Sequence, residues 1–188
     1  MNEHNILDDQ ESSPKDEQVR FAGFWIRFGA TFIDELVMIP INLLITYNAI
    51  AMKSLPLLLM LSILKVVYKP LFEWQRGATP GKMVVGIGVV SEQFQSISAE
   101  QAMIRYLPWA IADLIAISAS ILLYQLPEFA EVTDYAGLLQ LMENAPLQTV
   151  NQAYFFIFAL LVGQLAFDPR YQGFHDKHAQ TFVIYERK

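Results

Sequence analysis

The sequence predicts an all-α membrane protein with four transmembrane helices, a short amphipathic helix and a small cytoplasmic strand pair. Three observations carry this prediction. The chain is 54% hydrophobic and only 17% charged. Its apolar residues are gathered into blocks separated by polar stretches, whereas a soluble domain spreads them periodically. Its basic residues also concentrate on alternate connections between those blocks. The absence of cysteine excludes disulfides, thiol catalysis and cysteine-based zinc sites.

The first 20 residues are acidic and polar, and we expect them to form a disordered cytoplasmic tail. No short apolar core with a small-residue cleavage site follows them, so a cleaved signal peptide is not expected. The transmembrane domain is therefore predicted to occupy residues 21–188.

The first span is predicted at residues 24–47, within the apolar stretch FAGFWIRFGATFIDELVMIPINLLI. It contains Arg27, Asp34 and Glu35. An ionisable group in hydrocarbon costs roughly 2.5–3.5 kcal/mol on insertion scales. Arg27 and Asp34 fall on one helix face, with Asp34 about 10 Å further along the axis. Asp34 must therefore face protein or water.

The second span is predicted at residues 55–74. Its second half carries a stripe of charged residues spaced three or four apart, namely Lys65, Lys69, Glu73 and Arg76. Lys65 lies about 15 Å from the start of the span, close to mid-depth, and so needs a partner.

The connection after the second span contains a GATPGK turn and a β-branched run suited to a short strand at 84–90. Ser98 and Gln101 have capping-box spacing, which predicts an amphipathic helix over residues 99–106. A third span follows at 107–126 and contains Asp113.

Residues 127–150 form an acidic loop without Lys or Arg, in which a short interfacial helix is expected. The fourth span is predicted at 152–167. The tail then offers a strand at 181–185, which could pair with the strand at 84–90 because both should lie on the same side of the membrane.

Lys and Arg near the span ends predict the orientation. They cluster before the first span, in the second connection and in the tail, whereas the first outer turn has only Lys53. This pattern predicts a multi-pass protein of the inner membrane with cytoplasmic N- and C-termini.

With this orientation, helical rise brings Asp34, Asp113 and Lys65 to one layer about 10–16 Å from the cytoplasmic side, with Glu35 beside it. Two interpretations are open. The layer is either a salt-bridge cluster that sets helix packing, or a cation or proton site formed by Asp34, Asp113 and Glu35 with Lys65 as counter-ion.

Other functions find less support in the residues. His175, Asp176 and His178 are too few and too close in sequence to predict a metal site. No catalytic triad, nucleophile–base pair or nucleic-acid patch is apparent, so we expect neither an enzyme nor a cofactor nor a nucleic-acid partner.

Three motifs, AGFWIRFGATFID, WQRGATPGKMVVGIGVV and GFHDKHAQTFVI, resemble the RDD family of small bacterial and archaeal membrane proteins. The family is named for one arginine and two aspartates, which match Arg27, Asp34 and Asp176 by position. The resemblance implies transport of an unidentified ligand, with cation/proton antiport suggested for some members. It also implies a role for Asp176, which we expect to bond to Arg27. Charge reversal at both positions together should then restore what either reversal destroys.

The sequence therefore favours a transporter of a small cation (Na⁺ or K⁺ against H⁺) or of another small solute, in contact with the lipid bilayer. Four helices are few to enclose a permeation path, so several copies of the chain could be needed, which is consistent with a homo-oligomer. The alternative is a non-transporting accessory module that pairs with another membrane protein.

Overall fold

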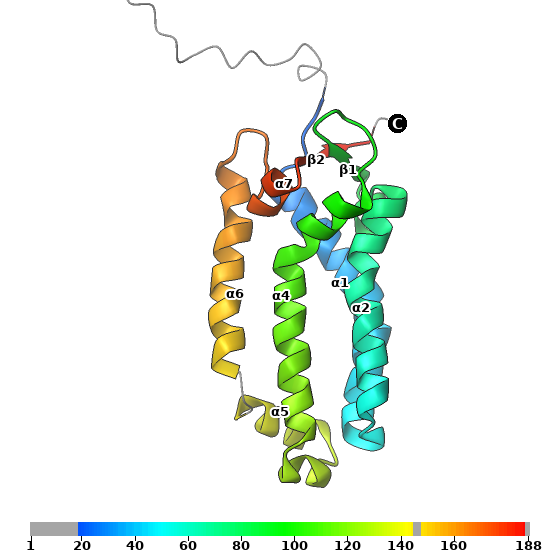
Figure 1. Ribbon diagram of the computed structural model, residues 1–188, viewed down its shortest axis with the longest axis vertical. Coiled ribbons are helices and arrows are strands. Elements are labelled where there is room, and N and C mark those ends of the chain that lie inside the picture. Colours follow the sequence, from blue (N-terminus) through cyan, green and yellow to red (C-terminus); the bar gives the residue numbers. More distant parts are fainter. Residues whose placement is uncertain (1–18, 145–147, 187–188) are drawn as a thin grey trace, which may run out of the picture.

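The computed structural model describes residues 19–144 and 148–186, so the predicted acidic tail lies almost entirely outside the described residues. Four helices are long and apolar enough to cross a membrane. They run side by side along the long axis of the molecule (Figure 1). They are α1 (Phe24–Tyr47), α2 (Leu55–Arg76), α4 (Ala99–Tyr124) and α6 (Gln148–Gly163). The prediction of four helices long enough to span a membrane is confirmed, although α4 begins eight residues before the predicted third span.

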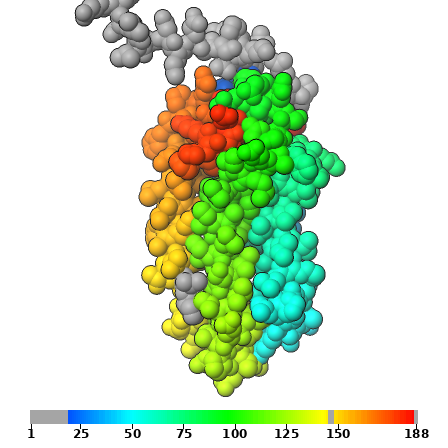
Figure 2. All heavy atoms as spheres, viewed as in Figure 1, coloured from blue at the N-terminus to red at the C-terminus, as the bar shows by residue number. Residues whose placement is uncertain are grey.

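The outer surfaces of these helices are apolar and exposed, as a lipid-facing surface should be. Phe32, Leu43 and Leu160, for example, are 60%, 64% and 73% exposed. Helix α4 contacts both α2 and α6. Figure 2 shows it packed between them.

The turn between α1 and α2 is tight and well defined. It consists of a π-helical turn, η2 (Asn48–Met52), followed by Lys53 in the left-handed conformation with φ 50°. The Ser54 hydroxyl then accepts from the Leu57 N–H and caps α2. The Asn48 side chain is fully buried and closes the turn, because its amide donates to the Ser54 carbonyl and to the Tyr124 hydroxyl, both at 2.9 Å.

Helix α2 ends at Gly77, whose φ of 69° suits glycine at a helix C-terminus. A short helix, α3 (Pro80–Val84), follows and is capped by the Thr79 hydroxyl. It contacts α1 and leads into strand β1 (Ile87–Ser91).

The capping box of Ser98 and Gln101 begins α4, as expected. The helix then continues through Pro108 to Tyr124, so the amphipathic segment is its first part and not a separate helix. Pro108 lacks one backbone N–H, but the apolar run after it still favours helix. Figure 1 shows the first turns of α4 at an angle to the rest.

The predicted loop contains a 3₁₀ turn, η3 (Pro127–Glu131), and the expected short helix, α5 (Tyr135–Glu143). Beyond α6 come a 3₁₀ turn, η4 (Gln164–Phe167), a short helix, α7 (Phe174–His178), and strand β2 (Thr181–Tyr185).

The predicted strand pairing is confirmed. Strands β1 and β2 are antiparallel, with Val89 opposite Val183. Phe21 forms an isolated bridge to Ile184, so the beginning of the described chain joins the same sheet. The sheet and α7 lie at one end of the bundle and α5 lies at the other (Figure 1). We call these the sheet end and the loop end.

Candidate functional site

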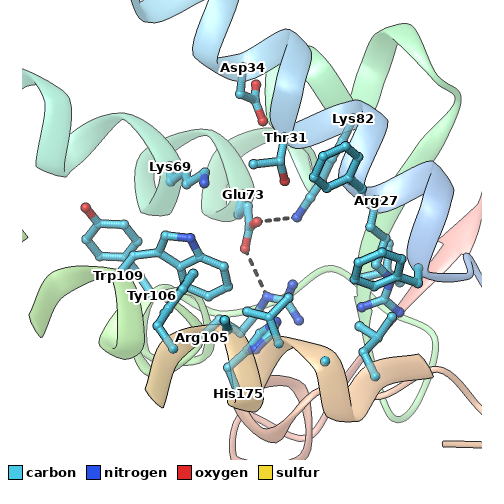
Figure 3. Close-up of a pocket in the computed structure, with 18 of the residues that line it drawn as sticks. Arg27, Thr31, Asp34, Lys69, Glu73, Lys82, Arg105, Tyr106, Trp109 and His175 are labelled. Atoms are coloured by element: carbon cyan, nitrogen blue, oxygen red, sulfur yellow. Dashed lines mark hydrogen bonds and ion pairs between the residues drawn. The ribbon is translucent and has the colours of Figure 1, made fainter. Parts of the chain in front are cut away.

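A cavity of about 390 Å³ lies in the sheet-end half of the bundle, between α1, α2, α4 and α6. One wall is apolar and comes mainly from α6. The other walls carry charged side chains from α1, α2, α3 and α4, several of which are labelled in Figure 3. The basic and acidic side chains that line it are Arg27, Lys69, Lys82, Arg105, Asp34 and Glu73.

Asp176, in α7, is fully buried behind this cavity. Its carboxylate accepts a 3.1 Å hydrogen bond from the Gly173 N–H at the start of α7. It also forms ion pairs with Arg27 and Arg105. Burial alone would raise the pKa of Asp176, but Arg105 and Arg27 outweigh it and hold that pKa well below its usual range.

The expected pairing of Arg27 with Asp176 is confirmed. Arg27 Nη1 lies 2.6 Å from Asp176 Oδ2, and Arg27 Nε donates to the Ala22 carbonyl at 2.8 Å. The contact ties the start of α1 to α7, which is 149 residues away in sequence. The second amino group of Arg27, Nη2, is buried and has no hydrogen-bond partner within the described chain.

Arg105 connects this pair to a second carboxylate. Its Nε lies 2.9 Å from Glu73 Oε2, and its Nη1 donates to the Thr181 hydroxyl at 2.6 Å. Lys82 pairs with the other oxygen of Glu73, and Figure 3 shows Glu73 between the two basic side chains. Burial lowers the pKa of Lys82, although Glu73 opposes this. The result is a continuous network of Arg27, Asp176, Arg105, Glu73 and Lys82, which we call the ion network.

Asp34 is buried and lies outside the ion network. Its carboxylate accepts hydrogen bonds from the Tyr68 hydroxyl at 2.9 Å, the Thr79 hydroxyl at 2.6 Å and the Gly81 N–H at 2.7 Å. Asp34 therefore holds the first turn of α3 against α1. A Cβ atom at Gly81 would lie 2.1 Å from the Ala30 carbonyl oxygen, so this close approach requires glycine.

The structure does not form the predicted layer of Asp34, Asp113 and Lys65. Asp113 accepts from Tyr106 on its own helix, and half-buried Lys65 has no ion pair or hydrogen bond within the described chain. Glu35 is exposed on α1. Helical rise estimated the depth of these groups, but it does not say how each helix is rotated toward its neighbours. A cation-binding role for Asp34, Asp113 and Glu35 stays a prediction.

His175 also lines the cavity, and its ring packs edge-on against Trp109 with centroids 4.8 Å apart. Its Nε2 lies 3.3 Å from Asp176. Burial lowers the pKa of His175 to about 4, and the charges of Arg105 and Arg27 act in the same direction. The imidazole is therefore neutral at neutral pH.

Sequence reasoning missed the partners in the ion network other than Arg27 and Asp176. Glu73 appeared only as one member of the charged stripe on α2. Arg105 and Lys82 counted only among the basic residues of the second connection, whose clustering predicted the orientation. One signal was available, because Glu73 is the sole acid in that stripe and lies in the last turn before a basic connection.

The chain matches the model of the RDD family over residues 21–180. The chain belongs to the RDD family. Its arginine and two aspartates, as the resemblance assigned them, are thus Arg27 and Asp176, which pair, and Asp34, which holds α3. The RDD chain is also 29% identical over 119 residues to an uncharacterized protein, YxaI, of Bacillus subtilis (strain 168), across 50% of this chain and 79% of that relative. No solved structure matches the chain.

Proposed function

We propose that this RDD protein moves a small solute across the membrane and that the cavity between α1, α2, α4 and α6 is its binding site. The observation that carries the proposal is the cavity itself, a space of about 390 Å³ among four helices of membrane-spanning length. Its volume falls in the range of small-molecule pockets. Its charged walls can replace the hydrogen bonds that a solute makes with water, and its apolar wall can cover the rest of the solute.

Helix α6 is the best candidate for a moving wall. None of its described residues is buried, and among the long helices it packs chiefly on α4. The Tyr154 hydroxyl donates to the Pro108 carbonyl at 2.6 Å and links the two helices. A wall held by one neighbour can move relative to the other helices at a modest energetic cost, as alternating access requires.

Exchange of a cation against H⁺ is a narrower form of this proposal, and the contacts of Asp34 argue against that residue as the carrier. Three donors already satisfy its oxygens. A cation would have to displace them and would release α3 from α1. Cation exchange through Asp113 or Glu35 avoids this cost, but neither residue lines the cavity, so it would need a separate path.

The positive-inside rule supports a cytoplasmic sheet end, and hence cytoplasmic termini and an inner-membrane location in a bacterium. Arg76, Lys82 and Lys177 belong to the sheet end, whereas the outer connections have Lys53 alone.

Access to the cavity from both sides of the membrane tests the proposal without knowledge of the solute. The chain has no cysteine, so a single one can be introduced at Ala159, which lines the cavity on α6. In sealed vesicles, a membrane-impermeant maleimide should label Ala159→Cys when it is added to either face.

Leu160→Cys is the matched control, because this neighbouring side chain is 73% exposed and does not line the cavity. It should face lipid and react slowly from both sides. Labelling of Ala159→Cys from one face only, in vesicles of known orientation, would contradict transport through this cavity.

Glu35 favours a second function, that of an accessory module. It is an exposed carboxylate about 16 Å along α1, with no ion pair or hydrogen bond in the described part of the chain. Contact with a basic or hydrogen-bonding side chain of another membrane protein, or of a second copy, would relieve the cost of its exposure to lipid.

Cross-linking from Glu35→Cys in membranes tests this second function, with Leu43→Cys as the lipid-facing control. A specific partner that cross-links to residue 35 and not to residue 43 supports the accessory function.

A further inference from the structure

The acidic side chains that line the cavity all have partners, whereas some of the basic ones have donors without an acceptor in the described chain. The described lining has four basic side chains, Arg27, Lys69, Lys82 and Arg105, and two acidic ones, Asp34 and Glu73. Asp176, just behind the lining, adds a third carboxylate. What matters for a ligand is which of these groups still has bonding capacity.

The carboxylates are occupied. Glu73 pairs with Lys82 and Arg105, and Asp176 pairs with Arg27 and Arg105 and accepts the Gly173 N–H. Asp34 accepts from three neutral donors. A cation entering the cavity would therefore meet carboxylates whose oxygens all accept at least one hydrogen bond and, at Glu73 and Asp176, whose charge is already paired with basic groups.

Two of the basic groups are in the opposite situation. The Nη2 amino group of Arg27 is buried and makes no hydrogen bond within the described chain. The Lys69 ammonium forms no ion pair or hydrogen bond there and lies 5.1 Å from the centre of the Trp109 ring. Figure 3 shows Lys69 and Arg27 on different sides of the cavity. A buried donor without an acceptor, as Arg27 Nη2 is, is costly, and an acceptor supplied by a ligand would remove that cost. Lys69 is half-buried, and an anion could pair with its ammonium without displacing a protein partner.

The remaining wall is suited to an apolar group. Phe155, Phe158, Ala159 and Val162 of α6 face the charged walls across the cavity. A bare inorganic anion would leave this surface uncovered, whereas an organic anion could cover it and so gain from burial of its apolar part.

We infer that the cavity binds a small organic anion. Its anionic group contacts Lys69 and its apolar body lies against α6. A ligand that carries a further oxygen also gains a hydrogen bond from Arg27 Nη2. This inference rests on the proposed function and names its substrate class. The anion can come from the water, as a free carboxylate, or from the membrane, as an acidic lipid, because both present the same chemistry.

Trp109 provides the readout, because it lines the cavity next to Lys69. Trp25 and Trp74 are 79% and 49% exposed, so Trp25→Phe and Trp74→Phe should be tolerated and leave Trp109 as the single tryptophan. The full chain is placed in nanodiscs of neutral phosphatidylcholine and titrated with benzoate. Benzylammonium is the probe of opposite charge, and benzyl alcohol is the neutral probe.

We expect benzoate to change the Trp109 fluorescence saturably, and the other two probes to bind at least tenfold more weakly. Lys69→Met should weaken benzoate binding about tenfold, because a charge-assisted contact is lost. Lys65→Met is the matched control. It removes the same charge one turn away on α2, outside the cavity lining, and should leave the affinity within about twofold.

Nanodiscs that contain phosphatidylglycerol distinguish the two sources of the anion. If an acidic lipid is the natural ligand, it will compete and weaken benzoate binding. If the ligand comes from water, benzoate will bind equally well in both discs. Either result supports the inference.

The inference is overturned if benzoate does not bind saturably, if benzylammonium binds more tightly, or if Lys65→Met and Lys69→Met have equal effects. The outcome is separable from that of the proposed function. Two-sided labelling of Ala159→Cys without benzoate binding would refute the substrate class and leave transport standing. Benzoate binding with one-sided labelling would refute transport and leave an anion site.

Discussion

The two ends of the bundle are held together by different interactions. At the sheet end, the ion network joins α1, α2, α3, α4 and α7 around two carboxylates. At the loop end, the described contacts include an apolar cluster around Leu123, Phe129 and Leu138 and the buried amide of Asn48. Lys53, a basic residue at this end, donates to the Ala130 carbonyl and has no ion pair within the described residues. In an apolar cluster, the loss of stability grows with the volume of side chain removed. Removal of one partner from a group of buried charges instead leaves an uncompensated charge, which costs about 3–5 kcal/mol at once. The sheet end should therefore be more sensitive to single substitutions and to pH.

Removal of one charge from the centre of the ion network should have the largest effect. Asp176→Asn leaves Arg27 and Arg105 without their shared counter-ion, and we expect a loss of about 3–5 kcal/mol in the free energy of unfolding. Unfolding in mixed dodecyl maltoside and SDS micelles measures it. Asp168→Asn is the control at the same end, because its partner Lys177 is 55% exposed at the side chain and the pair should contribute at most about 1 kcal/mol.

Exchange of charges tests whether Arg27 and Asp176 act as an isolated pair. Sequence analysis predicted that double reversal restores the protein, but the structure changes this expectation, since Asp176 also pairs with Arg105. Arg27→Asp combined with Asp176→Arg would place two arginines together, and we expect it to unfold as readily as the single reversals. Recovery to near the wild-type midpoint would mean that Arg105 is not a real partner.

Acidification should weaken the sheet end through His175. Its folded pKa is lowered to about 4, from a usual value near 6.5, so the unfolded chain binds the proton first as the pH falls. Stability should decline from about pH 6.5 to about pH 4, by at most about 3 kcal/mol, and this contribution should be constant outside that window. His175→Gln should remove the slope between pH 7 and pH 5, where the carboxylates of the unfolded chain are still ionised, when unfolding midpoints are compared at pH 7, 6 and 5. An unchanged slope would contradict the assignment to His175.

Asp34→Asn should have a smaller effect. The amide oxygen can keep the Tyr68 and Gly81 donors, but the new NH2 faces the Thr79 hydroxyl, which must then accept instead of donating, and all three charge-assisted bonds become neutral ones. We expect a loss of about 1.5–3 kcal/mol. Release of α3 should also expose Lys82 to trypsin, in vesicles oriented so that the sheet end of the protein faces the outside solution. Asp113→Asn retains an oxygen that can accept from Tyr106 and should change neither property appreciably.

The loop end should respond least. Asn48→Ala removes the two hydrogen bonds that the Asn48 amide donates, to the Ser54 carbonyl and the Tyr124 hydroxyl, and the one that it accepts from the Ser54 N–H. We expect this to cost about 1–2 kcal/mol. The loss should be the same at pH 7 and pH 5, because no charge is involved. A loss as large as that of Asp176→Asn would remove the contrast between the two ends.

The elements of the fold were predictable because their signals are local. The apolar stretch from Phe24 to Tyr47 matches α1 at both ends, and the Ser98–Gln101 capping box begins α4 where expected. Even a contact between distant parts of the chain was predictable for Val89 and Val183, since topology brings two short strands to the same end of the bundle.

The partners of the charged residues were less predictable. The resemblance to the RDD family pointed to Arg27 and Asp176, but helical spacing suggested a layer of Asp34, Asp113 and Lys65 that the structure does not form. Instead, Thr79 and Gly81 satisfy Asp34; the sequence predicted a turn at these residues but nothing in it linked them to Asp34.

The sequence by itself determined which segments form the long apolar helices, how many there are and where most of them begin and end. The reason is that the length, the hydropathy and the capping residues of a helix all lie within one segment. Only the tertiary structure decided which charge meets which, and that Lys69 and the Nη2 group of Arg27 stay unpaired beside an apolar wall. The physical reason is rotation: periodicity places a side chain on a face of its own helix, and only packing against the other helices decides what that face meets.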